Sequence, residues 1–369
     1  MRPEGNWKGM FAVEFGVVKR VTEGLFRYQG WPTVAKDEKG VLYVGASGHR
    51  LAHVCPFGKD YLYISRDEGK SWEGPVIAND SPFDDRDAGL WAWGDGQLAL
   101  TWFVNPKKLY TDRLETEPGL ASPMARAAVA MWDSMEYEGG SFIRFSKDGG
   151  KTWSEKRKVP VTAPHGPCRR ADGSLIYLGK ECQWGDPETY IPGNIYAVES
   201  RDEGKTWQKL SRVEFPEGFD RNEIHEPHAI VLPDGTILGA VRISGKGLAW
   251  TNGVAITRSE DGGKTFSQPQ VLDSNGTPPH FLLHSSGAVV LTYGRRAKPC
   301  GERARISWDG GKTWGEEIVI SEEAPTWDLG YPSSVELSDG SILTVYYQRY
   351  PGDDFTSVLQ TKWELPAKE

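Results

Sequence analysis

Arginine and histidine side chains stand close together at several points of this chain, and both residue types can do chemistry on an anionic ligand. Short segments such as "SGHRLAH" (47–53), "DDRDAG" (84–89) and "HEPH" (225–228) hold them, some beside carboxylates. An arginine guanidinium binds a carboxylate through two parallel hydrogen bonds. Histidine has an ordinary pKa of about 6.5, so it can transfer a proton near neutral pH. These residue types favour recognition of an anionic ligand if the fold brings them together.

A repeated eight-residue pattern shows which elements must position these side chains. It reads Ser-x-Asp-x-Gly-Lys-Ser/Thr-aromatic, and it occurs five times. The copies are "SRDEGKSW" (65–72), "SKDGGKTW" (146–153), "SRDEGKTW" (200–207), "SEDGGKTF" (259–266) and "SWDGGKTW" (307–314). The aspartate can accept backbone N–H bonds, the glycine adopts positive φ in a tight turn, and the aromatic residue begins a buried strand. We interpret each copy, here called an Asp turn, as structural, because one chain does not need five active sites.

Six strand–turn–strand units interleave with the Asp turns, and each of the first five is followed by one Asp turn. The units contain "WPTVAKDEKGVLYVGASG", "AGLWAWGDGQLALTWF", "GPCRRADGSLIYLGK", "EPHAIVLPDGTILGAVRI", "PPHFLLHSSGAVVLTYG" and "YPSSVELSDGSILTVYYQ". Each full unit supplies four short antiparallel strands, so the sequence predicts an all-β, six-bladed β-propeller with five Asp-box turns, in one domain over residues 1–369. We expect "SVLQTKWEL" and the N-terminal "FAVEFGVVKR" to complete the last blade, because closing the ring removes exposed edges.

One unit is longer than the others. An insertion at about residues 103–140 in the second blade contains "ASPMARAAVAMWDSM", which is compatible with a short helix. Long insertions in a compact fold tend to be lids or binding loops.

Strand parity divides the predicted propeller into two ends. The Asp turns and the other turns within the units lie at one end, and the connections between blades lie at the other. The residues at that second end whose side chains could bind a ligand or take part in catalysis are Trp31, His49, Arg50, His53, Arg86, Asp87, His165, Glu226, His228, Arg242, His280, Arg295, Arg296, Arg303 and Tyr331. Functional residues gather on loops that a rigid scaffold holds, and with His225 six of the seven histidines map there. Since this end is rich in arginine while the chain is acidic, we expect an anionic ligand such as a carboxylated sugar. The alternative is that these arginines are ordinary loop charges paired with Asp and Glu.

The five Asp turns and the six-bladed pattern resemble the sialidase (neuraminidase) superfamily, whose members carry Asp-box, or BNR, repeats. The resemblance covers nearly the whole chain and identifies it as a divergent member. Asp boxes favour the fold more strongly than the activity, because propellers with other functions also carry them.

The resemblance implies roles for particular residues. "LGYPSSVEL" resembles the segment that holds the family's tyrosine nucleophile, here Tyr331, and "IHEPHAIVLPDG" resembles the one that holds its glutamate partner, here Glu226. "LGAVRI" gives Arg242 as one of three arginines for the substrate carboxylate, and "YGRRAKPCGERARISWDGG" offers Arg303, with Arg296 as the alternative. A neutral tyrosine avoids the repulsion that a carboxylate nucleophile would meet beside an acidic sugar. Neighbouring arginines are expected to lower the phenol pKa.

The first blade departs from the family pattern. Where relatives have "YRIP", with the first arginine of the three, this chain has "YQGWP", and Gly30 takes the arginine's place. Arg50 is the candidate to replace that arginine.

The family's aspartic acid/base is also missing, since Cys55 lies near the position where it would fall. His53 or Asp87 must then serve as acid/base. We favour His53 for its pKa, and we expect Asp87, beside Arg86, to be ionised and structural.

The substrate-binding candidates are Arg50, Arg86, Arg242, Arg296, Arg303, His165, His228, His280 and Trp31. The three histidines among them recur at equivalent strand starts, so they are packing residues, donors to sugar hydroxyls, or acid/base groups. Tyr331 is alternatively a core aromatic residue, and Glu226 a carboxylate that caps backbone groups.

Composition bounds the partners. The net charge is −8, the isoelectric point is about 5.5, and no basic run is present, so neither nucleic acid nor an anionic membrane is an expected partner. The sequence predicts no cofactor and no metal, and the four cysteines show no CxxC spacing. The N-terminus has no apolar signal-peptide core and no apolar run approaches a membrane span, which leaves a cytoplasmic protein or an exported one whose signal has been removed. The oligomeric state stays open.

Three functional hypotheses follow. The first is an exo-α-sialidase-like retaining glycoside hydrolase that acts on a terminal acidic sugar, a 2-keto-3-deoxy acid. The second is a glycosidase or polysaccharide lyase that acts on a uronic-acid-containing glycan. The third is a non-catalytic glycan-binding propeller.

Overall fold

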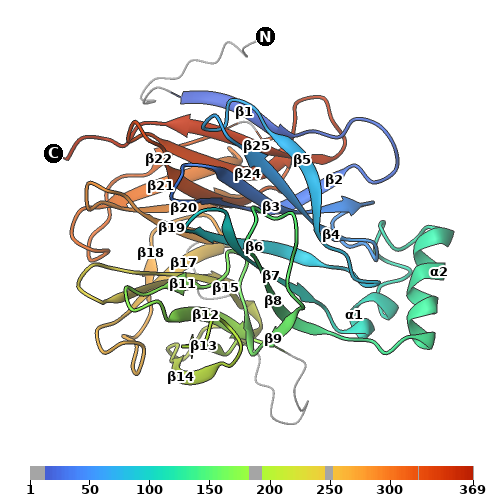
Figure 1. Ribbon diagram of the computed structural model, residues 1–369, viewed down its shortest axis with the longest axis horizontal. Coiled ribbons are helices and arrows are strands. Elements are labelled where there is room, and N and C mark those ends of the chain that lie inside the picture. The colour runs from blue at the N-terminus through green and yellow to red at the C-terminus, as the bar shows by residue number, and fades with distance from the viewer. Residues whose placement is uncertain (1–12, 183–192, 246–251, 323, 369) are drawn as a thin grey trace.

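The repeated units form six antiparallel sheets arranged as the blades of a propeller (Figure 1). The structure is a computed structural model that describes residues 13–182, 193–245, 252–322 and 324–368. The first twelve residues, where the sequence shows no signal-peptide pattern, lie outside this description. The innermost strands pack against one another around the axis: β2 (Tyr28–Lys36) contacts both β6 (Arg86–Trp93) and β23 (Gly330–Glu336). The six-bladed β-propeller predicted from the repeats is confirmed.

Each blade runs from an inner to an outer strand. The first has β2, β3 (Leu42–Arg50), β4 (Lys59–Ser65) and β5 (Glu73–Asn79), and the second has β6, β7 (Gln97–Val104), β8 (Gly140–Ser146) and β9 (Arg157–Val159). In the third, β10 (Val161–Thr162) and β11 (Cys168–Arg169) both pair with β12 (Leu175–Glu181), followed by β13 (Ile195–Ser200) and β14 (Gln208–Val213). The fourth has β15 (Ile224–Val231), β16 (Ile237–Ser244), β17 (Asn252–Ser259) and β18 (Gln270–Leu272), and the fifth has β19 (Pro279–Leu283), β20 (Val289–Arg295), β21 (Gly301–Ser307) and β22 (Ile318–Val319).

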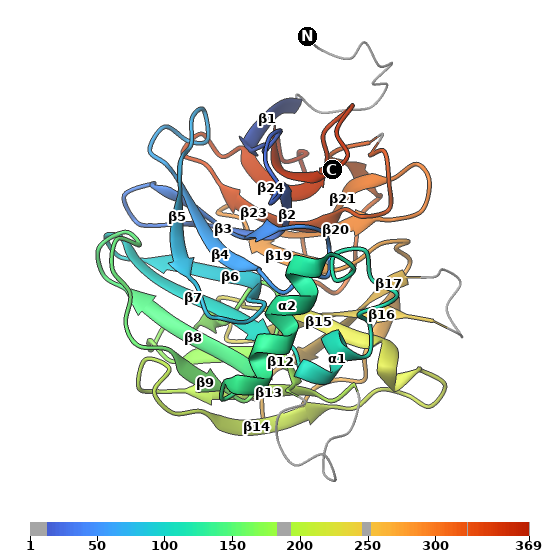
Figure 2. The same ribbon diagram turned by 90° about the vertical axis from the view of Figure 1, so that its right-hand side faces the viewer.

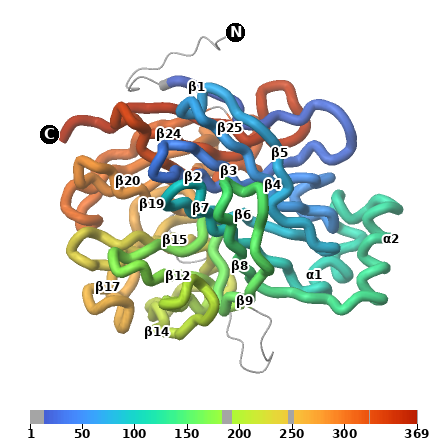
Figure 3. Tube along the Cα trace, in the orientation of Figure 1, coloured from blue at the N-terminus to red at the C-terminus, as the bar shows by residue number. Residues whose placement is uncertain are grey.

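Strands from both ends of the sequence close the ring. The sixth blade contains β23, β24 (Ile342–Arg349), β25 (Thr356–Trp363) and, as its outer strand, β1 (Val13–Lys19). β1 is antiparallel to β25, with Glu14 opposite Lys362, and Figure 3 shows the two strands side by side. The predicted closure of the last blade is therefore confirmed, and it pairs an edge that would otherwise be open.

The Asp turns are built by side-chain hydrogen bonds to their own backbone. In the second blade, Asp148 Oδ1 accepts from the Thr152 backbone N–H at 2.9 Å, and Asp148 Oδ2 accepts from the Thr152 hydroxyl at 2.6 Å. Ser146 Oγ accepts from the Gly150 N–H at 2.9 Å, and Gly150 has a φ of 83°. Trp153 then packs against the core between blades. The turn is structural, as its sequence predicted.

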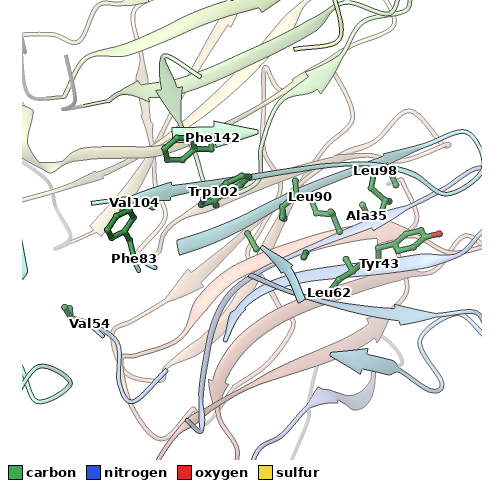
Figure 4. Packing of buried hydrophobic residues seen from close by; sticks show 14 of the residues in the cluster. Ala35, Tyr43, Val54, Leu62, Phe83, Leu90, Leu98, Trp102, Val104 and Phe142 are labelled. Atoms are coloured by element: carbon green, nitrogen blue, oxygen red, sulfur yellow. The ribbon is translucent and has the colours of Figure 1, made fainter. Parts of the chain in front are cut away.

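Hydrophobic clusters fill the spaces between neighbouring blades. Figure 4 shows one of them, in which Tyr43 and Leu62 of the first blade meet Leu90, Leu98 and Trp102 of the second. These side chains are almost completely buried, and alternate residues of each strand supply them. Such packing holds the inner strands at fixed positions around the axis.

The connection between β7 and β8 carries three helices, and a further 3₁₀ helix, η2 (Arg221–Glu223), precedes β15. The three are α1 (Lys107–Thr111), α2 (Pro123–Met131) and the 3₁₀ helix η1 (Trp132–Ser134). Ser122 caps α2 by accepting from the Ala125 N–H, and Pro123 occupies its first turn. Figure 2 shows both α-helices on one face of the ring, the face at which the inner strands begin. The helix expected within this segment is confirmed.

Within the described residues, no helix combines the length and apolar character needed to cross a membrane.

Candidate active site

Four inner strands begin with an irregularity that turns one side chain toward the centre of the propeller. The register shifts lie between residues 30 and 33, 86 and 89, 225 and 228, and 330 and 333. At each, one non-glycine residue has positive φ: Trp31 (51°), Asp87 (57°), Glu226 (44°) and Tyr331 (51°). Positive φ is costly for such residues and tends to persist at functional sites, and bulges redirect side chains. Sequence patterns did not reveal this shared geometry.

Tyr331, Glu226 and Arg242 form a chain of hydrogen bonds. The Tyr331 hydroxyl donates to Glu226 Oε1 at 2.7 Å, and Arg242 Nη1 donates to Glu226 Oε2 at 2.7 Å. Tyr331 comes from β23, Glu226 from β15 and Arg242 from the facing position on β16. The two residues predicted as nucleophile and base are 105 positions apart in sequence and in direct contact in the structure.

The environment sets the charges of this pair. Burial alone would raise the pKa of Glu226, but Arg242 and His225 outweigh it and lower that pKa to about 2. Burial raises the pKa of Tyr331 well above its ordinary value; the carboxylates of Glu226 and Asp87 add to this, and Arg242 and Arg296 only partly oppose it. The arginines do lower the phenol pKa, as expected, but burial and the two carboxylates outweigh them. The resting pair is a neutral phenol that donates to an ionised carboxylate.

Asp87 lies close to this pair and is buried. Burial raises the pKa of Asp87 to about 7, although Arg86 lowers it. Asp87 and Glu226 line one cavity of about 180 Å³ together with Lys180 and His225. The expectation of an ionised, structural aspartate is corrected: Asp87 is half protonated near neutral pH and faces the same space as Glu226.

His53 belongs to a different hydrogen-bond network. Its Nδ1 lies 2.9 Å from the Tyr28 hydroxyl and 3.1 Å from Asp328 Oδ1, and its ring meets Trp31 edge-on at 5.0 Å. Tyr347 also donates to Asp328, at 2.9 Å. Burial lowers the pKa of His53, against the hydrogen bond to Asp328. Asp87 lines the cavity with Glu226 and His53 does not, and the choice between them as the acid/base group stays a prediction.

The buried arginines Arg50 and Arg303 are held in ion pairs within the protein. Arg50 is fully buried and donates to both carboxylate oxygens of Asp84, at 2.5 and 3.0 Å. Arg303 is 1% exposed and donates to Glu322 at 2.9 Å and to the Ser321 carbonyl at 2.6 Å. A ligand cannot reach either guanidinium, so their prediction as substrate-binding residues is wrong.

Arg296, by contrast, is partly exposed. It lies beside the Tyr331 ring, with its Cζ 5.9 Å from the ring centroid. Its buried Nε has no hydrogen-bond partner, and the same holds for the Nε of Arg242. Arg242 and Arg296 are therefore the two predicted arginines that face Tyr331 with donors to spare.

Trp31 and Arg86 pack against each other beside the site. Trp31 is 1% exposed, and the Arg86 guanidinium stacks on its ring at 4.1 Å. Arg86 is also buried and pairs with Asp84 at 3.3 Å. These residues hold the neighbourhood of Tyr331 in place, and contact of Arg86 or Trp31 with substrate stays a prediction.

The position of the missing arginine is occupied by a tyrosine. A Cβ on Gly30 would lie 3.1 Å from the Tyr28 ring, and the Tyr28 hydroxyl donates to Asp328. Hydrogen bonds from His53, Tyr347 and Tyr28 outweigh burial and lower the pKa of Asp328. Tyr28 and Asp328 therefore lie beside Gly30, the position where the resemblance implies an arginine.

His165, His228 and His280 stack on one another at the centre of the ring, with centroids 4.4 to 5.5 Å apart. All three are buried, and burial lowers the pKa of each. Their Nδ1 atoms are engaged by Thr33, Phe281 N–H and Ser334 N–H respectively. The contacts among the three rings support the packing alternative, and binding of substrate by these histidines stays a prediction.

Asp328, Tyr28, Tyr347 and Lys180 are site residues that sequence reasoning missed. The sequence gave no motif for them; only their position at the blade-connecting ends of strands set them apart. No group of three or more His, Cys, Asp or Glu side chains in the described ranges is arranged to hold a metal ion.

Comparisons with known proteins agree with this architecture. A crystal structure of a protein of unknown function from Dyadobacter fermentans DSM 18053 is 23% identical, with a TM-score of 0.76 over 96% of this chain and 99% of that chain. The NanB sialidase from Streptococcus pneumoniae is 14% identical, with a TM-score of 0.65 over 95% of this chain and 70% of that chain. Trypanosoma rangeli sialidase is 14% identical, with a TM-score of 0.59 over 91% of this chain and 54% of that chain. No curated protein sequence matches the chain.

Fold and comparisons define a six-bladed propeller of the BNR repeat type. The model of the BNR repeat-like domain family matches residues 124–344, so the chain belongs to that family. At these low identities, the likeness to sialidases shows the fold alone.

Proposed function

We propose that this protein is a retaining exo-glycosidase of the sialidase type that releases a terminal acidic sugar. The observation that carries the proposal is the buried contact of 2.7 Å between the Tyr331 hydroxyl and Glu226, with Arg242 on the other carboxylate oxygen. A nucleophile beside an ionised base that a third group orients is the arrangement of covalent catalysis.

The first step forms a bond between the Tyr331 oxygen and the anomeric carbon. The phenol proton passes to Glu226 Oε1, and the bond between the anomeric carbon and the leaving oxygen breaks. Asp87, whose pKa of about 7 leaves a large fraction protonated at neutral pH, donates its proton to that leaving oxygen.

The second step restores the protein. Asp87, now a carboxylate, takes a proton from a water molecule whose oxygen attacks the anomeric carbon. The bond from this carbon to Tyr331 breaks, and Glu226 returns the proton to the phenol oxygen. Two displacements at one carbon give retention of configuration.

Arg242 and Arg296 favour a substrate sugar that carries an acidic group. Both flank Tyr331 and have a buried Nε without an acceptor. A carboxylate on the sugar would receive charge-assisted hydrogen bonds from them. It would also repel a carboxylate nucleophile, which a neutral tyrosine avoids.

The replaced arginine favours a second candidate within the same chemistry. Tyr28 and the ionised Asp328 lie where a third arginine would complete the clamp for a sialic acid carboxylate. An acidic sugar other than sialic acid, such as a uronic acid in a glycan, would need only the two remaining arginines. Cleavage of such a glycan by β-elimination would give an unsaturated product that absorbs in the near ultraviolet, and hydrolysis would not.

The test compares wild type with Tyr331→Phe on 4-methylumbelliferyl glycosides of α-N-acetylneuraminic acid and of uronic acids. Turnover of one glycoside by wild type that collapses in the variant supports the proposal and identifies the sugar. Equal turnover by both proteins, or none by wild type on any acidic glycoside, contradicts it.

A further inference from the structure

A second cavity, of about 510 Å³, opens on the same face of the propeller beside Arg296. We call it the basic cavity and define it by Arg296, Lys298, Trp327, Asp328 and Arg349. It lies between the β20–β21 loop, the segment before β23 and the end of β24. It shares no lining residue with the cavity of Glu226 and Asp87, and the proposed mechanism uses only its Arg296.

Three cations in the basic cavity lack an acidic partner. Arg296, Lys298 and Arg349 form no ion pair within the part of the chain that the structure describes. Asp328, the carboxylate that lines the same cavity, already accepts hydrogen bonds from the Tyr28 and Tyr347 hydroxyls, and its Oδ1 lies 3.1 Å from His53 Nδ1.

The neighbouring carboxylate of Glu322 is bound to Arg303. Asp328 keeps its charge, so the lining carries three cations against one carboxylate, a local excess of positive charge in a chain with a net charge of −8. Such a patch attracts anions.

The rim of the cavity carries an exposed aromatic residue. Trp327 is 61% exposed, more than almost any other large hydrophobic side chain in the described residues. An indole face in contact with water offers a flat apolar surface on which the C–H groups of a sugar ring can pack. An aromatic rim above unpaired cations is suited to a sugar that carries an anionic group.

The basic cavity adjoins the proposed nucleophile. Arg296 lines the cavity, and its guanidinium lies 5.9 Å from the centroid of the Tyr331 ring. A glycan with one acidic unit at Tyr331 can therefore extend its next unit past Arg296 toward Lys298 and Arg349.

We propose that the basic cavity binds a second acidic sugar unit of the substrate, through a carboxylate or sulfate group held by Lys298 and Arg349 and a ring packed on Trp327. The inference rests on the proposed function for its choice of a glycan ligand. It makes the substrate a polyanionic glycan rather than a glycan with one terminal acid.

The experiment measures binding by calorimetry in the Tyr331→Phe background, where turnover cannot consume the probe. The probes are tetrasaccharides of hyaluronan, which carries carboxylates; of chondroitin sulfate, which carries carboxylates and sulfates; and of chitin, which is neutral. The variants are Lys298→Gln with Arg349→Gln, and separately Trp327→Ala. The matched control is Lys70→Gln, an exposed lysine in an Asp turn at the opposite end.

We expect at least one acidic probe to bind about tenfold or more tightly than the chitin probe, and the double variant to lose about tenfold or more in affinity. Trp327→Ala should weaken binding, Lys70→Gln should leave it unchanged, and added salt should weaken it in proportion to screening. Preference between hyaluronan and chondroitin sulfate distinguishes a carboxylate from a sulfate as the anion.

Equal affinity for acidic and neutral probes, unchanged affinity in the double variant, or no binding of either acidic probe would overturn the inference. These outcomes are separate from failure of the proposed function. Binding that depends on Lys298 and Arg349, without turnover of any glycoside, would leave the inference standing and remove the mechanism. Turnover of a simple acidic glycoside without such binding would do the opposite.

Discussion

The two ends of the propeller are built from the same strands but serve different roles. At one end, five Asp turns repeat nearly the same residues and the same hydrogen bonds, from Ser65–Asp67 in the first blade to Ser307–Asp309 in the fifth. At the other end, equivalent positions hold Trp31, Asp87, Glu226 and Tyr331, which share only a positive φ. Repetition at one end maintains the ring, and divergence at the other places different side chains around one centre.

The two ends also differ in the environments, and therefore the pKa values, of their carboxylates. The aspartates of the Asp turns are largely exposed and satisfied by their own turn, where hydrogen bonds from Thr152 lower the pKa of Asp148 to about 2. At the site end, carboxylates are buried, and Asp87 and Glu226 have pKa values of about 7 and about 2. Two carboxyl groups whose environments separate their pKa values suit an acid and a base.

The largest expected effect comes from the nucleophile. Tyr331→Phe should lower turnover of the responsive acidic glycoside about 10³-fold or more, because the variant cannot form a bond to the anomeric carbon. The matched control is Tyr346→Phe, which removes another buried hydroxyl, one that meets Thr361 away from the site. Steady-state kinetics should show the control close to wild type, and equal losses in both variants would mean that the effect is structural.

Removal of the proposed acid ranks next. Asp87→Asn should lower kcat/KM by about 10²- to 10⁴-fold. In wild type, an acid with a pKa of about 7 is active when protonated, so kcat/KM should be flat below that pH and fall tenfold per unit above it. Asp87→Asn should lose this limb, and His53→Gln should keep it. A limb that disappears in His53→Gln instead would assign the acid to His53.

A third test removes a buried ion pair near the site without changing the proposed reacting residues. Arg50→Gln leaves the fully buried Asp84 without its bidentate partner, so the free energy of unfolding should fall by about 3–5 kcal/mol. Urea denaturation measures the change. A loss below 1 kcal/mol would show that Arg86 and Tyr110, which also contact Asp84, are sufficient to hold it.

The smallest effect is expected at the repeated end. Asp148→Ala removes one of five similar turns on the surface, so the Tm should fall by less than about 4 °C, and turnover should be unchanged. Thermal unfolding and the glycoside assay check both quantities. Loss of turnover in this variant would contradict the conclusion that the Asp-turn end is structural and the other end carries the site.

The fold could be predicted because its signals are local and repeated. The Ser-x-Asp-x-Gly spacing dictates each turn through hydrogen bonds within eight residues, and six units determine six blades. The closing strand was predictable because an open blade edge is unfavourable.

The site was only partly predictable, because its side chains depend on contacts between distant strands. Tyr331 and Glu226 were found through segments that resemble a family. The roles of the arginines were not found, since burial of Arg50 depends on its ion pair with Asp84, while Arg296 forms no ion pair in the described residues. Asp328 has no sequence signal at all, because its partners Tyr28 and His53 lie about 300 positions away.

The central claim is that Tyr331 forms a bond to the sugar, and mass spectrometry of the intact chain tests it most directly. The protein is incubated with a 2,3-difluoro sialic acid or with the glycosyl fluoride of a 2-deoxy-2-fluoro uronic acid, according to the glycoside that it hydrolyses. The account predicts a mass increase equal to the monofluoro sugar, located on the peptide that contains Tyr331 and absent in Tyr331→Phe. Labelling of any other residue, or the same labelling in Tyr331→Phe, would contradict it.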